Sequence, residues 1–125
     1  MARYYADTYA LVEILRGNPS YERYASEELV TSEFNLLELA YALTRDYGKE
    51  KAVEILRMVR VFVAIIQPTD EDYAEASALR IGLKKQSRNL SLIDALGYVL
   101  AKRLKIPFLT GDREFKGLDG VEYVK

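Results

Sequence analysis

Short apolar segments alternate with longer amphipathic segments along nearly the whole chain, and this alternation restricts the folds that the chain can adopt. Strands are expected at residues 3–7, 29–32, 62–66, 107–110 and 121–124. Helices are expected between them, at residues 9–16, 33–47, 49–60, 70–85 and 91–105. Because short apolar strands are separated by helices, the sequence predicts an α/β fold with a mostly parallel central sheet and helices on both faces.

The helix at residues 33–47 has clear boundary signals. Ser32 is placed to cap its N-terminus, and Gly48 is placed to end it after Tyr47. Residues at helical spacing predict the buried face of this helix: Phe34, Leu37, Ala40, Tyr41 and Thr44.

Length and composition are those of one soluble globular domain covering residues 1–125. Half of the residues are hydrophobic and 30% are charged. The longest apolar run, residues 61–66, is far too short to span a bilayer. The N-terminal residues lack the apolar core of a secretory signal, so we expect a cytoplasmic protein.

The chain contains no cysteine and no histidine. It therefore lacks the nitrogen and sulfur ligands that zinc and copper prefer, and it also lacks the most common general base. Any bound metal must be held by oxygen atoms, which favours Mg²⁺ or Mn²⁺. The net charge of -1 argues against binding of nucleic acid through phosphate contacts alone.

Four acidic residues lie at the inner edges of apolar segments: Asp7, Glu38, Asp94 and Asp112. Desolvating a carboxylate is costly unless something offsets the cost, and a shared divalent cation is one way to do so. In a parallel sheet the functional crevice lies beyond the carboxyl ends of the strands. Asp7 and Asp112 are expected at such strand ends, while Glu38 and Asp94 are expected in the early turns of helices. We therefore expect all four side chains to point into one crevice.

The ordered set of these acids and their neighbours resembles a PIN domain, most closely the small VapC type of toxin ribonuclease. The resemblance is carried by Tyr5-Ala6-Asp7-Thr8, Glu38, residues 91–96 and residues 110–115. It implies an endoribonuclease whose acidic quartet Asp7, Glu38, Asp94 and Asp112 holds Mg²⁺ or Mn²⁺. It also implies a small antitoxin partner that blocks the cleft.

Three further residues near the quartet are assigned supporting roles by the resemblance. Thr8 and Thr110 match the hydroxyls that accompany the acids, and Glu114 stands where the family often has an aspartate. Homodimers are common in families of this kind, and the apolar stretch at residues 58–66 is longer than one buried strand requires. A dimer is therefore expected.

The chemistry of phosphodiester hydrolysis agrees with this interpretation. The reaction needs an activated water, neutralisation of charge on the phosphoryl oxygens and stabilisation of the leaving oxygen. Carboxylate-held Mg²⁺ supplies all three.

Each acid also has a purely structural interpretation, with Glu38 the hardest to explain in this way. Asp94 follows Ser91 at capping-box spacing, Asp112 follows a glycine in a turn, and Asp7 can cap the first helix. If these roles are the whole account, the chain is a non-catalytic PIN-like module that binds RNA or protein.

Basic residues that could contact RNA phosphates form a less specific set: Arg16, Lys84, Lys85, Arg88 and Arg113. A short basic run is more often a solvated face than a binding site. The target RNA and its cleavage position leave no signal in the sequence.

Overall fold

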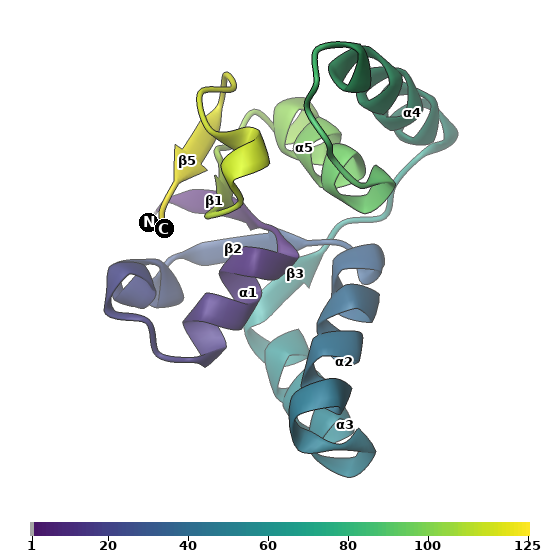
Figure 1. Cartoon of the computed structure of the whole chain (residues 1–125). Coiled ribbons are helices and arrows are strands. Elements are labelled where there is room, and N and C mark those ends of the chain that lie inside the picture. Colours follow the sequence, from purple (N-terminus) through teal and green to yellow (C-terminus); the bar gives the residue numbers. More distant parts are fainter. Residues whose placement is uncertain (1) are drawn as a thin grey trace.

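A computed structural model describes residues 2–125, and its strands and helices follow the predicted order (Figure 1). The strands are β1 (Arg3–Ala6), β2 (Glu28–Thr31), β3 (Val63–Ile65), β4 (Phe108–Thr110) and β5 (Val121–Tyr123). The α-helices are α1 (Thr8–Leu15), α2 (Glu33–Tyr47), α3 (Lys49–Phe62), α4 (Asp70–Lys85) and α5 (Leu92–Leu104). Two 3-10 helices complete the fold, η1 (Pro19–Ser26) and η2 (Arg113–Phe115).

The five strands form one parallel sheet in the order β3-β2-β1-β4-β5. The chain builds the sheet outward from β1 through β2 and β3, and then returns to the other side of β1 with β4 and β5. The carboxyl ends of β1 and β4 therefore flank the switch point, where ligands bind in open α/β sheets. The predicted fold, an α/β domain with a parallel central sheet, is confirmed.

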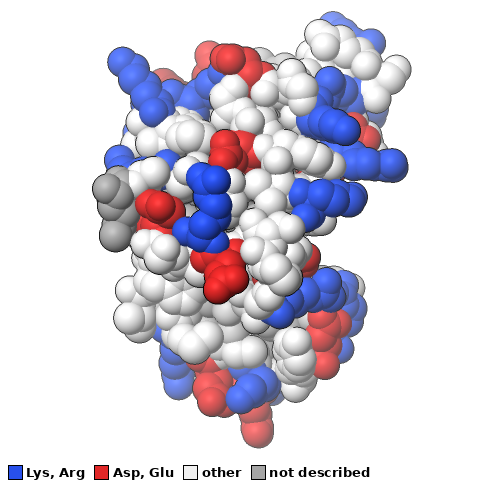
Figure 2. Space-filling view, turned by 90° about the vertical axis from the view of Figure 1, so that its left-hand side faces the viewer, with Lys and Arg blue, Asp and Glu red and all other residues white. Residues whose placement is uncertain are grey.

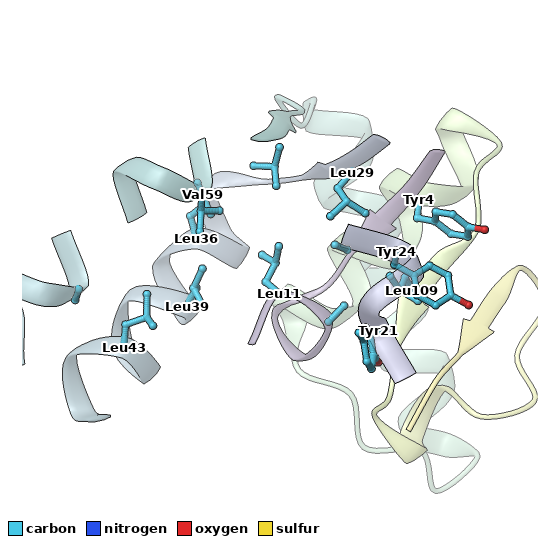
Figure 3. Close-up of a cluster of buried hydrophobic side chains, with 14 residues drawn as sticks. Tyr4, Leu11, Tyr21, Tyr24, Leu29, Leu36, Leu39, Leu43, Val59 and Leu109 are labelled. Atoms are coloured by element: carbon cyan, nitrogen blue, oxygen red, sulfur yellow. The ribbon is translucent and has the colours of Figure 1, made fainter. Parts of the chain in front are cut away.

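Helices cover both faces of the sheet, as predicted: α1, α2 and α3 pack on one face, and α4 and α5 on the other (Figure 1). Side chains alternate between the faces along each strand, as the pleat requires. In β1, for example, Tyr4 and Ala6 enter the first core, while Tyr5 enters the second. Figure 3 shows the first core, in which leucines of α1 and α2 face Leu29 and Leu109 of the sheet.

The predicted boundaries of α2 are confirmed. The Ser32 hydroxyl accepts a hydrogen bond from the Asn35 N–H, and Gly48 ends the helix at a φ of 89°, a conformation that favours glycine. Helix α3 continues to Phe62, two residues past its predicted end at residue 60, and shortens the following strand.

The predicted buried face of α2 is wrong. Phe34, Leu37 and Tyr41 are 36%, 66% and 72% exposed. The face that enters the core is offset by two residues and consists of Leu36, Leu39 and Leu43, together with a buried polar residue, Asn35.

The surface carries charges of both signs. Lysine and arginine side chains lie among aspartates and glutamates on the face shown in Figure 2. None of the helices within residues 2–125 combines the length and the apolar character needed to cross a membrane.

Candidate functional site

An open pocket of about 420 Å³ lies beyond the carboxyl ends of β1 and β4, and all four predicted acids line it. Asp7, Glu38, Asp94 and Asp112 share this lining with Thr8, Tyr9 and Tyr41. Their convergence depends on the parallel sheet, because Asp7 follows β1 and Asp112 follows β4, its neighbour.

Asp7 is the most buried of the four acids, with 2% of its surface exposed. Its Oδ1 accepts a hydrogen bond of 2.8 Å from the Ala10 N–H and so caps α1. Its Oδ2 accepts a hydrogen bond of 2.5 Å from the Thr110 hydroxyl at the end of β4. Both oxygens are therefore fixed, one by the helix and one by the neighbouring strand.

Glu38 lies in the second turn of α2 and is half-buried. Its Oε1 accepts a hydrogen bond of 2.7 Å from the Thr8 hydroxyl, which belongs to the first turn of α1. This bond links the two helices that meet at the mouth of the pocket. The predicted supporting residue Thr8 therefore contacts one member of the quartet, and Thr110 contacts another.

Asp94 and Asp112 both occupy capping positions. Asp94 completes a capping box with Ser91 at the start of α5, through bonds of 3.2 and 3.0 Å. Asp112 accepts a hydrogen bond of 3.0 Å from the Glu114 N–H and caps η2. The capping and turn roles predicted for Asp7, Asp94 and Asp112 are thus confirmed. The same hydrogen bonds hold these side chains at the pocket.

Burial and mutual repulsion disfavour ionisation of three of the acids. The pKa of Asp7 is raised to about 8, chiefly by burial and to a smaller extent by the charges of Asp94 and Asp112, although the hydrogen bonds from Thr110 and Ala10 oppose the rise. Burial also raises the pKa of Glu38, and the nearby charge of Asp94 adds to this rise. The pKa of Asp94 is itself raised by burial and by the charge of Asp112. The pocket therefore favours an added positive charge.

The donor set fits a hard divalent cation, although the side chains do not converge on one point. Throughout residues 2–125, no three acidic side chains lie close enough together to hold a metal ion as they stand. Carboxylate and hydroxyl oxygens are nevertheless the ligands that Mg²⁺ and Mn²⁺ prefer. In the described part of the chain, no lysine or arginine forms an ion pair with any of the four acids.

The remaining predicted residues lie outside the lining of this pocket. Glu114 accepts a hydrogen bond of 3.1 Å from the Asn89 N–H in the loop before α5. Arg88 donates to the backbone carbonyl oxygens of Glu114 and Lys116, at 2.7 and 3.2 Å, and so anchors the segment that carries Asp112. Arg16 lines a different, largely apolar pocket of about 220 Å³ between α1, α2 and α3.

The other basic candidates are exposed. Lys84 and Lys85 lie in the last turn of α4, and Arg113 lies in η2 next to Asp112.

Two buried residues beside the pocket were not predicted. Asn35 is 1% exposed and Tyr5 is fully buried, and the Tyr5 hydroxyl donates to Asn35 Oδ1 at 2.6 Å. In the sequence, Tyr5 stands two positions before Asp7 and Asn35 three positions before Glu38, but neither position indicates a role in the site.

A scan against protein-family models matches the PIN domain over residues 4–121. No curated protein matches the sequence. The family match covers the four acids and nearly the whole chain.

Solved structures with the same fold include several from VapBC complexes. VapC20 of Mycobacterium tuberculosis, described as a toxin that cleaves the sarcin–ricin loop, has a TM-score of 0.79 at 20% identity, over 98% of this chain and 99% of that chain. A chain of VapBC2 from Rickettsia felis, bound to promoter DNA, has a TM-score of 0.76 at 21% identity, over 98% and 99% of the two chains. VapBC-1 from nontypeable Haemophilus influenzae has a TM-score of 0.76 at 20% identity, over 97% and 96%.

Proposed function

The chain belongs to the PIN domain family, and on this premise we propose that it is a metal-dependent endoribonuclease that hydrolyses RNA phosphodiester bonds. The observation that carries the proposal is the open pocket at the switch point of the sheet, lined by Asp7, Glu38, Asp94 and Asp112. Perturbed carboxylates gathered in a pocket are typical of catalytic sites.

The four acids would hold Mg²⁺ or Mn²⁺. The bound metal would activate water and neutralise charge on the phosphoryl oxygens. The acids are suited to this role because their charges lack basic partners among residues 2–125. A cation would offset both the burial of Asp7 and the repulsion among the carboxylates.

The protein contributes rigid placement of the acidic oxygens. Asp7 is held by the Ala10 N–H and the Thr110 hydroxyl, Asp94 by the Ser91 N–H at the start of α5, and Asp112 by the Glu114 N–H in η2. Side chains fixed in this way lose little further freedom when the substrate binds. Lys84, Lys85 and Arg113 remain candidates for contacts with RNA phosphates.

We further propose that the protein is the toxin of a toxin–antitoxin pair, since relatives of the same fold come from VapBC complexes. A small antitoxin would inhibit it by covering the pocket. A basic side chain of that partner would suit the pocket, because it would supply the positive charge that the acids lack.

A homodimer is the proposed assembly. Met58, Val61 and Phe62 at the end of α3 are 52%, 86% and 40% exposed. They precede β3, one of the two edge strands of the sheet. Association of two copies through this surface would remove apolar area from water.

The experiment that tests the nuclease is cleavage of a labelled RNA mixture with Mg²⁺, with Mn²⁺ and with a chelator. We expect metal-dependent cleavage that falls by at least about 100-fold in Asp94→Ala. Asp46→Ala is a matched control, because Asp46 is a partly exposed helical aspartate outside the pocket of the four acids.

If the protein binds RNA but cleaves it neither with Mg²⁺ nor with Mn²⁺, the proposed nuclease function is wrong. That result would favour the alternative, a non-catalytic PIN-like module. Cleavage that Asp94→Ala leaves intact would place the active site elsewhere.

A further inference from the structure

We propose that Tyr5 and Asn35 are positioning residues that orient Glu38 toward the pocket through the Thr8 hydroxyl. The inference rests on the proposed function, because it assigns these residues to the metal-holding role of Glu38. Neither residue lines the pocket, so neither can act on a ligand directly.

Hydrogen bonds connect the interior of the sheet to Glu38 in an unbroken series. The Tyr5 hydroxyl donates to Asn35 Oδ1 at 2.6 Å, and Asn35 Nδ2 donates to Thr8 Oγ1 at 3.2 Å. Thr8 Oγ1 then donates to Glu38 Oε1 at 2.7 Å. The series joins β1, α2 and α1.

In each of these hydrogen bonds, the donor is the residue further from Glu38 along the series and the acceptor is the residue nearer to it. The Thr8 hydroxyl has one proton, and because it accepts from Asn35 its proton is available to the carboxylate. The backbone carbonyl of Asn35 is a poorer acceptor for this proton, at 3.5 Å from Thr8 Oγ1. The amide of Asn35 thus fixes the direction in which Thr8 donates.

The amide itself is held on its other side. Asn35 Oδ1 also accepts a hydrogen bond of 2.9 Å from the Ser32 hydroxyl. With two donors on Oδ1 and an acceptor at Nδ2, rotation of the amide would break three bonds in a place without solvent, since Asn35 is 1% exposed.

The Tyr5 hydroxyl, at which the series begins, is held in place because the Tyr5 ring is fully buried. It stacks on Phe108 at 5.7 Å between ring centroids. Gly97 of α5 lies against both rings, and a Cβ atom there would come within 2.9 Å of the Tyr5 ring and 3.1 Å of the Phe108 ring. The rigid core therefore determines where the Tyr5 hydroxyl points, and through it the placement of one oxygen of Glu38.

The test is the affinity for Mn²⁺, measured by calorimetry on the whole chain without RNA. We expect Asn35→Leu to weaken Mn²⁺ binding roughly tenfold, at the lower end of the range found for residues that support metal ligands. Tyr5→Phe, which removes a bond one step further from Glu38, should weaken it roughly threefold. Melting of the metal-free variants, followed in parallel, reports their stability.

Tyr24→Phe is the matched control. Tyr24 is also buried, and its hydroxyl also donates a 2.6 Å hydrogen bond to a side chain, that of Glu122, which lies outside the pocket. We expect Tyr24→Phe to lower the melting temperature about as much as Tyr5→Phe and to leave Mn²⁺ affinity unchanged. A purely structural role for Tyr5 would make the two variants alike in both measurements.

A double-mutant cycle tests the route through Thr8. If Asn35 acts through the Thr8 hydroxyl, Asn35→Leu should change Mn²⁺ affinity in the native sequence but not in Thr8→Val. Equal effects in both backgrounds would overturn the inference.

The outcomes separate this inference from the function on which it rests. If the native protein binds Mn²⁺ and Tyr5→Phe and Asn35→Leu bind it equally well, the positioning role is wrong and the proposed nuclease stands. If the native protein binds neither Mn²⁺ nor Mg²⁺, both are overturned.

Discussion

Asp7 is the residue whose protonation should most affect the stability of the metal-free protein. Its pKa is raised from 3.8 to about 8 by burial. Between these values the folded state holds a proton that the unfolded state releases, so the free energy of unfolding falls as pH rises. We expect the melting temperature in chelator to decline from pH 5 to pH 8.5, and to decline less in Asp7→Asn. Equal pH dependence of the two proteins would contradict the raised pKa of Asp7.

Metal should reverse this destabilisation, because a cation stabilises the ionised acids that protons otherwise neutralise. We expect saturating Mg²⁺ or Mn²⁺ to raise the melting temperature, more at pH 8 than at pH 6 because protons compete with the metal. Asp7→Asn should reduce the gain. A melting curve of the native protein that the metal leaves unmoved would show that the quartet is not a metal site.

Among the elements, α4 and α5 are joined by a buried carboxylate. Asp72 completes a capping box with Thr69 and accepts two hydrogen bonds from Arg103, at 3.0 and 2.9 Å. Although burial favours its neutral form, the Thr69 N–H and the Arg103 guanidinium lower the pKa of Asp72 below 3.8. Its contribution to stability is therefore present above pH 3.8 and is lost as the pH falls through the lower, folded value.

We expect Asp72→Ala to reduce the free energy of unfolding by about 1–3 kcal/mol at pH 7, since it removes the cap and both bonds from Arg103. Urea denaturation measures this change. Asp46→Ala is the comparison, because within residues 2–125 the Asp46 carboxylate forms an ion pair with its exposed neighbour Arg45 alone, and its effect should stay within about 0.5 kcal/mol. Equal losses in the two variants would show that Asp72 does not join the helices.

The turn between β4 and η2 depends on a glycine at position 111. A Cβ atom there would collide with the Tyr9 ring and with the backbone carbonyl of Val124. Because a backbone atom cannot move aside as a flexible side chain can, we expect Gly111→Ala to destabilise the protein by about 1–3 kcal/mol. Thermal melting checks this, with Gly82→Ala in α4 as control, since open space surrounds Gly82. If Gly111→Ala leaves the melting temperature unchanged, the close packing of this turn is contradicted.

At the scale of the whole molecule, the proposed dimer predicts that a substitution in its interface lowers the molecular mass measured in solution. Val61→Lys should shift a dimer toward the monomer in light scattering, because it places a charge in the apolar surface at the end of α3. Ile81→Lys is the control, as Ile81 is exposed on the separate helix α4. A monomeric native protein, or a dimer that Val61→Lys leaves intact, would exclude this interface.

The sequence predicts the fold well because its signals are local. Alternating segment types and caps such as Ser32 fix the order of the elements, and the parallel sheet then brings the strand-end acids together. The buried face of α2 could not be chosen in this way, because Leu36, Leu39 and Leu43 repeat the spacing of Phe34, Leu37 and Tyr41 on the opposite side of the helix. Periodicity identifies an apolar stripe but not which of two stripes meets the sheet.

The hydrogen bonds that connect Tyr5, Asn35 and Thr8 could not be predicted from the sequence either. Tyr5 and Asn35 are 30 residues apart, and although Tyr5 lies in the motif that contains Asp7, nothing in the sequence indicates that the two side chains meet. Helix η1 was also missed, because its apolar contribution consists of isolated tyrosines, Tyr21 and Tyr24, rather than a periodic run.

The order of the strands has a consequence for the newly made protein. The bond between Asp7 and Thr110 spans 103 positions and depends on pairing between the first and fourth strands. A chain still under synthesis lacks this pairing until β4 has left the ribosome. The pocket of the four acids therefore takes its final form only after β1, β2, β3 and β4 have all been made.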